Sequence, residues 1–324
     1  MQPNSQQGWI GVDVGASCVK VAQVSLKDGR LHLDHAAITP RRESNADATA
    51  QAASVRYEIE GALATIGTLN TKRCAGMLSM SECDVTPGKP TDAGVKAAGG
   101  CVDTWLAEST PREEHWYTFT ASHDAAEGLA NDLLDAGLSC RTIDAGTHAL
   151  ARAAAWASPG KRGDVLGVLD WGYSGAMYCS VLNGCPVYVR QLKEVALREL
   201  EDTLIAELDV NRTEAYRLLS GVATDENRDF AELVGELAKP LAARLADELT
   251  KTLEHLRSHR TTVAPREVVV FGGGGALGLE RVIGPRIGCP VRAWKLPGDG
   301  AAAGVPACLL GPAVALSALA WEGR

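Results

Sequence analysis

The chain has 324 residues, nine cysteines and a formal net charge of −8 at pH 7. A chain of this length predicts about two domains, and its acidic balance argues against nucleic-acid binding. The cysteines are odd in number and contain no C-x-x-C pair, which is typical of a reducing compartment rather than of a disulfide framework or zinc site. The N-terminal MQPNSQQGWI shows no signal-peptide pattern. We therefore expect a cytoplasmic protein.

The first forty residues predict three consecutive strands. GVDVGASCVKVAQVSLKDG, residues 11–29, is expected to form a strand, a glycine turn and a returning strand. Residues 30–40 alternate in polarity and predict the third strand. An Ala-rich segment with apolar residues at helical spacing then predicts a helix over residues 46–68.

The next stretch is interrupted by prolines and glycines. Residues 82–115 show the least regular pattern of the chain. A strand is expected at 116–122, a helix at 124–137 and a strand at 138–144. We interpret residues 75–140 as a small inserted α/β subdomain.

A helix over 147–157 and the polar turn SPGKRG precede a second hairpin, VLDWGYSGAMYCSVLNG, at residues 168–184. Residues 194–259 are charged and helical, with a leucine every fourth position forming one apolar stripe. That stripe favours a buried helix face over a partner-binding face, and Pro240 inside it should kink or break the helix. The leucines of the stripe are Leu233, Leu237, Leu241, Leu245, Leu249 and Leu253.

The C-terminal part predicts a strand at Val268–Phe271, a glycine turn, a helix, a strand in CPVRAW and a last helix. Residues 301–321 carry no charge and are long enough to span a bilayer. Two prolines interrupt this segment, and Pro312 would suit the first turn of a helix that ends at Trp321. We therefore expect a buried terminal helix and no membrane span.

The two hairpins are copies of one unit. Aligned without gaps, Asp13 matches Asp170, Gly15 matches Gly172, Ser17 matches Ser174 and Val24 matches Val181. Repetition of a whole supersecondary unit is a strong fold signal. The chain is therefore predicted to be a duplicated α/β protein whose two hairpins could hold a polyphosphate and its metal from two sides.

The first hairpin carries groups suited to an anion and a metal. Gly15, Ala16 and Ser17 form a turn whose backbone N–H groups could bind phosphate, with Lys20 as a counter-charge. Asp13 could hold a water molecule of Mg²⁺, which keeps several waters when bound to proteins. An ordinary β-hairpin is the alternative for either copy alone.

The second hairpin offers Gly172, Tyr173 and Ser174 as phosphate contacts. Asp170 is the candidate catalytic residue, either holding metal-bound water or positioning an attacking water; alternatively, it caps backbone N–H groups at a strand end. The third motif, Gly273, Gly274 and Gly275, could face a nucleotide from a helix start. It lacks the chain length and the acidic residue of a dinucleotide fold.

These three motifs resemble those of the actin–Hsp70–sugar kinase (ASKHA) superfamily, within it the PilM (competence protein A) type related to FtsA. The resemblance implies a ribonuclease H-like, actin-like ATPase fold with two lobes, residues 8–163 and 164–324. It also implies a partner-binding insertion at 75–140 and a helical subdomain at 194–263. The implied cofactors are ATP and Mg²⁺.

By the same resemblance, the protein is a cytoplasmic scaffold of type IV pilus assembly or type II secretion, peripheral at the inner membrane. Its partner would be the cytoplasmic tail of a single-span, PilN-like protein, and self-association is possible as in actin relatives. Relatives usually have Thr or Asn after the second Asp-x-Gly and a Gly-Gly pair further on, where this chain has Gly175, Ala176, Lys193 and Glu194. ATP hydrolysis is therefore expected to be slow or absent. A sugar or acid kinase of the same superfold and a degenerate partner-recruitment protein without nucleotide are the alternatives.

Overall fold

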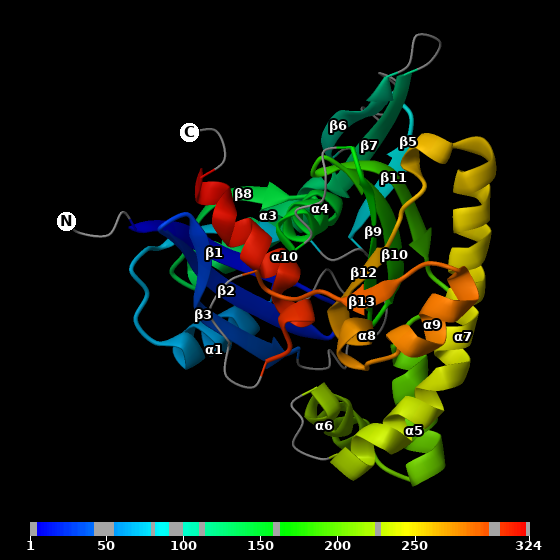
Figure 1. The fold of residues 1–324 in the computed structure, drawn as a ribbon. Helices are drawn as coiled ribbons and strands as arrows, with labels where there is room; N and C mark the ends of the chain where they lie inside the picture. Colours follow the sequence, from blue (N-terminus) through cyan, green and yellow to red (C-terminus); the bar gives the residue numbers. More distant parts are fainter. Residues whose placement is uncertain are drawn as a thin grey trace. The chain divides into compact units, whose positions relative to one another are not determined.

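The computed structural model describes eight stretches of the chain, and these form two compact units (Figure 1). Unit 1 comprises Met1–Ala149, Pro297–Gly300 and Pro312–Arg324, and unit 2 comprises Leu150–Leu296 and Ala301–Gly311. The described residues are 5–41, 55–78, 82–90, 100–109, 114–157, 163–223, 228–297 and 305–321. The expected polar turn SPGKRG, except its last residue Gly163, and the first part of the expected helix at 46–68 lie outside them.

Unit 1 is built on a five-stranded sheet in the order β3-β2-β1-β4-β8. The first three strands are antiparallel, whereas β4 and β8 extend the sheet in parallel pairing. All three strands expected within the first forty residues are present. The strands are β1 (Ser5–Val14), β2 (Cys18–Lys27), β3 (Arg30–Pro40), β4 (Arg73–Met77) and β8 (Ser139–Asp144).

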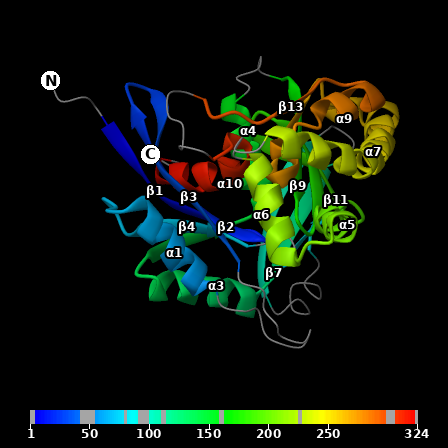
Figure 2. The same ribbon diagram turned by 90° about the horizontal axis from the view of Figure 1, so that it is seen from below.

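Helices cover both faces of this sheet (Figure 2). On one face lie α1 (Arg56–Ile66) and α3 (His123–Asp135), and a Cβ added to Gly76 of β4 would touch Leu133 of α3 at 3.2 Å. The described part of the expected helix at 46–68 thus begins at Arg56. On the opposite face, Gly11 of β1 lies against the backbone of Ala313 in the last helix, α10 (Ala307–Ala318). The core between these layers contains buried Ile10, Val12 and Ile59.

A second, three-stranded sheet in the order β5-β7-β6 also belongs to unit 1. The strand expected at 116–122 is part of β7, and the described residues of the stretch 82–115, namely 82–90, 100–109 and 114–115, are more regular than the sequence pattern indicates. The stretch contributes β5 and β6, because pairing with the aromatic-rich β7 outweighs weak local strand propensity. Of residues 75–140, both ends belong to β4 and β8 of the five-stranded sheet. The new strands are β5 (Cys83–Pro87), β6 (Gly100–Ser109) and β7 (Glu114–Ser122).

Unit 2 repeats the topology with its own five-stranded sheet, in the order β11-β10-β9-β12-β13. Three antiparallel strands are again followed by two strands in parallel pairing. The core contains Trp171, Phe271 and Trp294, of which the last donates a hydrogen bond to Ala153 O in α4 (Gly146–Ala157) at 2.8 Å. The strands are β9 (Val165–Gly172), β10 (Gly175–Leu182), β11 (Cys185–Leu192), β12 (Val268–Phe271) and β13 (Val291–Ala293).

Three helices follow β11: α5 (Arg198–Leu208), α6 (Arg212–Ala223) and α7 (Arg228–His259). The leucine stripe of α7 is buried at Leu241, Leu245, Leu249 and Leu253, although Leu233 is 39% exposed. Pro240 does not break the helix, which runs as one element of 32 residues (Figure 1). Pro240 is exposed, so the carbonyl group that loses its amide partner can be hydrated.

The C-terminal elements differ from expectation in two places. The glycines after β12 do not form an open turn but are themselves helical, as α8 (Gly272–Ala276), and are followed by α9 (Glu280–Ile287). The last helix begins at Ala307 rather than Pro312, which lies inside it. Short 3₁₀ turns are present at Thr261–Val263 and Leu319–Trp321. Among the described residues, no helix is both long and apolar enough to cross a membrane.

Candidate functional site

Strand pairing brings two of the predicted residues of the first hairpin together. Asp13 on β1 is directly opposite Lys20 on β2, and Lys20 Nζ lies 2.8 Å from Asp13 Oδ2. Both side chains are largely buried, at 3% exposure for Asp13 and 12% for Lys20. The predicted counter-charge is therefore already ion-paired with the predicted metal-binding carboxylate.

The second oxygen of that carboxylate fits a ligand. Asp13 Oδ1 is buried and accepts no hydrogen bond from any described residue. A buried carboxylate oxygen without a partner is costly, and a metal-bound water would satisfy it. Asp13 is thus compatible with the expected Mg²⁺, held through water.

Two cationic side chains, those of Lys20 and Arg41, lie against the turn between β1 and β2. A Cβ on Gly15 would lie 3.2 Å from Lys20 Nζ, so the glycine permits the ammonium group to sit against the turn. Arg41 donates its backbone N–H to Ser17 O at 2.8 Å and its guanidinium to Gly15 O at 3.4 Å. Sequence reasoning missed Arg41, although Cys18 pairs with Pro40 and the same register places residue 41 beside Ser17.

The second hairpin has the same register but different chemistry. Asp170 is opposite Met177, just as Asp13 is opposite Lys20, so the gapless alignment is structurally correct. Met177 is buried and supplies no charge. Asp170 instead lies against the start of α8: a Cβ on Gly272, whose φ is +73°, would be 2.6 Å from Asp170 Oδ1. The structure therefore brings Asp170 next to the glycine segment that the sequence also singled out.

Tyr173 of the second turn is fixed by the helices that follow. Its hydroxyl donates to Glu201 Oε2 of α5, and Arg212 of α6 lies 3.5 Å from the hydroxyl oxygen. Burial, followed by the hydrogen bond to Glu201, raises the pKa of Tyr173 to about 12, so the phenol stays protonated at neutral pH. The neighbouring Ser174 is exposed. No sequence signal pointed to Glu201 or Arg212, which lie far along the chain in charged helices.

Several glycines of the motifs are required by packing. A Cβ on Gly274 would meet the Trp171 ring at 2.2 Å, and one on Gly275 would meet Val270 O at 2.8 Å. Gly273 lies against Leu197, with a Cβ distance of 2.8 Å to Leu197 Cδ1. These close approaches explain the glycine run without a ligand.

Gly175, where the resemblance to the family led us to expect Thr or Asn, also has a structural cause. Its φ is +153°, and a Cβ there would lie 3.1 Å from Leu192 O and 3.4 Å from Lys193 Cα. Lys193 and Glu194 are exposed, and Arg244 donates to Glu194 O. The candidate residues thus form one group in unit 1, around Asp13, and one in unit 2, around Asp170.

The repeated strand order and the two matching Asp-containing hairpins define the duplicated actin-like ATPase fold that the sequence motifs predicted. Among solved structures, the chain is similar to a chain of the "PilM-PilN type IV pilus biogenesis complex", with a TM-score of 0.74 and 18% identity over 97% of this chain and 99% of that one. The fold and the likeness to PilM-type structures are therefore confirmed.

Two further structures share this fold. The ethanolamine utilization protein EutJ from Carboxydothermus hydrogenoformans matches with a TM-score of 0.60 and 13% identity, covering 98% of this chain and 90% of that one. Component A of the (R)-2-hydroxyglutaryl-CoA dehydratase of Acidaminococcus fermentans matches with a TM-score of 0.52 and 12% identity, covering 97% of each chain. No family model and no curated protein matches the chain.

Proposed function

We propose that this chain is a PilM-like, nucleotide-binding scaffold of type IV pilus assembly or type II secretion. The observation that carries the proposal is the likeness to a chain of the PilM–PilN complex over nearly the whole length of both chains. The hairpin residues support nucleotide binding, because Asp13 retains an unsatisfied buried oxygen and Lys20 remains beside the turn. The scaffold acts at the cytoplasmic side of the inner membrane.

The proposed ligand is ATP with Mg²⁺, and the metal neutralises phosphate charge when bound. Asp13 would hold the metal through water, and Ala16 and Ser17 would offer backbone N–H groups to phosphate, since the Gly15 N–H already donates to Cys18 O at 3.0 Å. Asp170 is the proposed catalytic residue in unit 2. Hydrolysis is slow or absent in this proposal. Buried Met177 provides no cation at the position that corresponds to Lys20, and Gly175 replaces the polar residue usual in relatives.

The proposed partner is the cytoplasmic tail of a single-span, PilN-like membrane protein, bound by residues 75–140. Within this range, the three-stranded sheet is distinct from the five-stranded sheet of unit 1. It presents the apolar side chain of Leu106 on β6 with 41% exposure, where a partner tail would contact it. Self-association of the scaffold is a further part of the proposal.

Nucleotide binding is tested with a fluorescent ATP analogue and Mg²⁺, titrated into the full-length protein. We expect saturable binding that Asp13→Asn weakens at least tenfold, because the amide replaces the carboxylate that would hold the metal water. Asp209→Asn is the matched control, since it makes the same chemical change at an exposed left-handed position that tolerates Asn. No saturable binding, or equal binding by both variants, would favour the degenerate scaffold instead.

Partner binding is tested separately by site-specific photocrosslinking in cells. A photoreactive amino acid at position 106 should crosslink to a single-span inner-membrane protein, identified by mass spectrometry. The control is position 233 on α7, a leucine of comparable exposure at 39%. A membrane partner captured from position 233 but not from position 106 would contradict the assignment of residues 75–140.

A further inference from the structure

We propose that Cys74 and Cys140 form an oxidation site, at which a peroxide converts the two thiols into a reversible disulfide. The pair lies in unit 1 and shares no residue with the candidate nucleotide-binding hairpins. It is therefore an additional property of the chain and stands or falls independently of the proposed function.

The geometry of the sheet brings the two thiols together. Cys74 on β4 and Cys140 on β8 are direct partners in the parallel pairing of these strands. Neighbouring strands lie about 4.8 Å apart, and disulfides join residues whose Cα atoms are about 4.4–6.8 Å apart. Each thiol is the largest cause of the other's pKa shift, which requires the two side chains to lie close together, although the Cys140 thiol itself donates to Thr142 O at 3.5 Å. No strand has to move far to bridge them.

The two thiols differ in a way that assigns their roles. Cys140 is half-buried on the edge strand, whereas Cys74 is fully buried in the core. The interaction with the Cys74 thiol lowers the pKa of Cys140, against the opposing effect of burial, and the interaction with Cys140 raises the pKa of Cys74. Cys140 is thus the accessible nucleophile and Cys74 the resolving thiol, the arrangement typical of redox-sensitive pairs.

The reaction takes place in two balanced steps. The Cys140 thiolate attacks one peroxide oxygen, the O–O bond breaks, and Cys140 becomes a sulfenic acid as hydroxide leaves. The Cys74 sulfur, losing its proton, then attacks the sulfenic sulfur; an S–S bond forms and the sulfenic oxygen leaves as water. The two sulfurs together lose two electrons, and the peroxide is reduced to two molecules of water.

The disulfide would tie together the strands that flank the three-stranded sheet. Both β5-β7-β6 and α3 lie between Cys74 and Cys140 in the sequence. Closing a long loop of this kind restricts the unfolded chain, so the oxidised form should be more resistant to denaturation. Because cells keep most cytoplasmic thiols reduced, such a disulfide would be transient.

The test treats the full-length protein with hydrogen peroxide and maps the products by non-reducing peptide mass spectrometry. We expect a linked Cys74–Cys140 peptide pair that a dithiol reductant removes, together with a raised urea midpoint. Cys140→Ser should abolish the linkage and the shift in midpoint. Sulfinic acid at Cys140 without a link to Cys74, or links only among other cysteines, would overturn the proposal.

Alkylation kinetics give a second readout that does not depend on the disulfide. The reaction rate of Cys140 with iodoacetamide should rise through a midpoint below the ordinary thiol pKa of about 8.5, and Cys74→Ala should move that midpoint upward. Cys83 is the internal control, because it is also half-buried but burial raises its pKa to about 12. Equal pH profiles for Cys140 and Cys83 would contradict the proposed roles. The double variant Cys101→Ser/Cys185→Ser removes two exposed thiols that could form links between molecules.

Discussion

The Asp13–Lys20 pair shows how one residue can serve both stability and a ligand. Each charge is largely withdrawn from water, and each compensates the other at 2.8 Å. Removing one partner of a buried pair leaves the other charge uncompensated, which costs far more than losing an exposed pair. Removing either member of the pair alone is therefore expected to destabilise the hairpin, whether or not a nucleotide is present.

Replacing Lys20 with Met, the residue at the corresponding position of the second hairpin, tests this expectation. We expect Lys20→Met to lower the free energy of unfolding by about 3 kcal/mol, because Asp13 keeps its buried charge without a partner. The control Lys27→Met removes a lysine that is 45% exposed and pairs with Asp34, and should cost less than about 1 kcal/mol. Urea unfolding curves measure both, and similar losses for the two variants would refute the argument.

How far the sequence predicts the candidate site depends on the range of its contacts. The Asp13–Lys20 contact follows from the hairpin register, which the glycine turn makes predictable. Glu201 bonds to Tyr173 across a long sequence separation, and neither its charge nor its helical position distinguishes it from neighbouring acidic residues. Contacts within one supersecondary unit could therefore be predicted, whereas contacts that depend on how helices pack could not.

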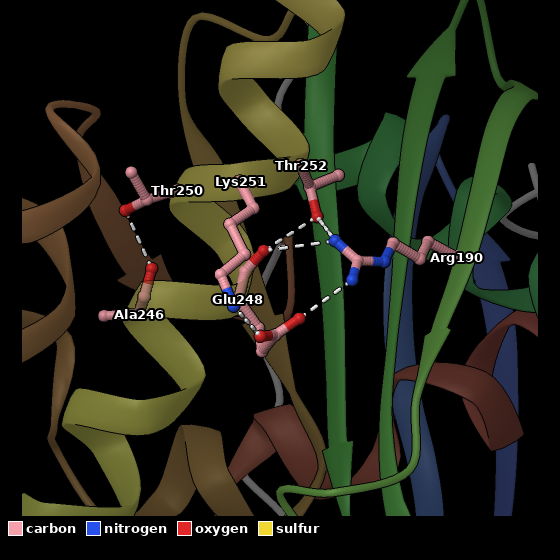
Figure 3. Close-up of polar contacts among 6 residues, drawn as sticks. All are labelled: Arg190, Ala246, Glu248, Thr250, Lys251 and Thr252. Atoms are coloured by element: carbon pink, nitrogen blue, oxygen red, sulfur yellow. Dashed lines mark hydrogen bonds and ion pairs between the residues drawn. The ribbon is translucent and has the colours of Figure 1, made fainter.

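At the scale of elements, a polar network joins strand β11 to helix α7 (Figure 3). Arg190 donates to Thr252 Oγ1 at 2.6 Å and to Glu248 Oε2 at 2.8 Å. Lys251 pairs with the other oxygen of Glu248, and its hydrogen bond is the main cause that lowers the pKa of Glu248, with Arg190 contributing less. That stabilisation is present above the unfolded pKa of a glutamate, about 4.3, and is lost as the pH falls below it.

Replacing Arg190 or Lys251 with alanine distinguishes the contact between β11 and α7 from the contact within α7. Arg190→Ala should lower the free energy of unfolding by about 2 kcal/mol, because it leaves Thr252 and Glu248 without their partner from β11. Lys251→Ala should cost less than about 0.5 kcal/mol, since Lys251 is 67% exposed and its pairing lies within one helix. Thermal unfolding at neutral pH provides the comparison, and a larger loss for Lys251→Ala would contradict it.

The elements that sequence reasoning missed share one physical cause. Strands β5 and β6 are stabilised by pairing with β7, a contact that local residue patterns do not encode. Pro240 is tolerated because the rest of α7 is fixed by its buried leucines, and Pro312 lies within α10, whose residues are almost all buried. In each case, tertiary packing overrides a local propensity that was read correctly.

At the scale of the whole molecule, the duplicated topology was predictable because the repeat conserves strand register as well as residue identity. The packing of α10 against the first strands of unit 1 was not predictable, because these elements are far apart in the sequence. Ser317 of α10 donates to Trp9 O at 2.6 Å and accepts from the N–H of Val24 at 3.0 Å. The last helix is therefore part of the core that the first strands build.

Gly11 is the position at which an added side chain would most disturb the packing of α10 on β1. It is the first residue of the first hairpin segment, and a Cβ there would lie 1.8 Å from Ala313 O, so its lack of a side chain serves packing. Gly11→Ala should push α10 away from β1 and cost more than about 4 kcal/mol, or prevent folding. Gly128→Ala, in helix α3 with no atom within 4 Å of the added Cβ, should instead stabilise by about 0.5–1 kcal/mol. Circular dichroism and urea unfolding of both variants decide the matter: an unfolding midpoint for Gly11→Ala near that of the unmodified chain would show that the N-terminal strand does not require the C-terminal helix.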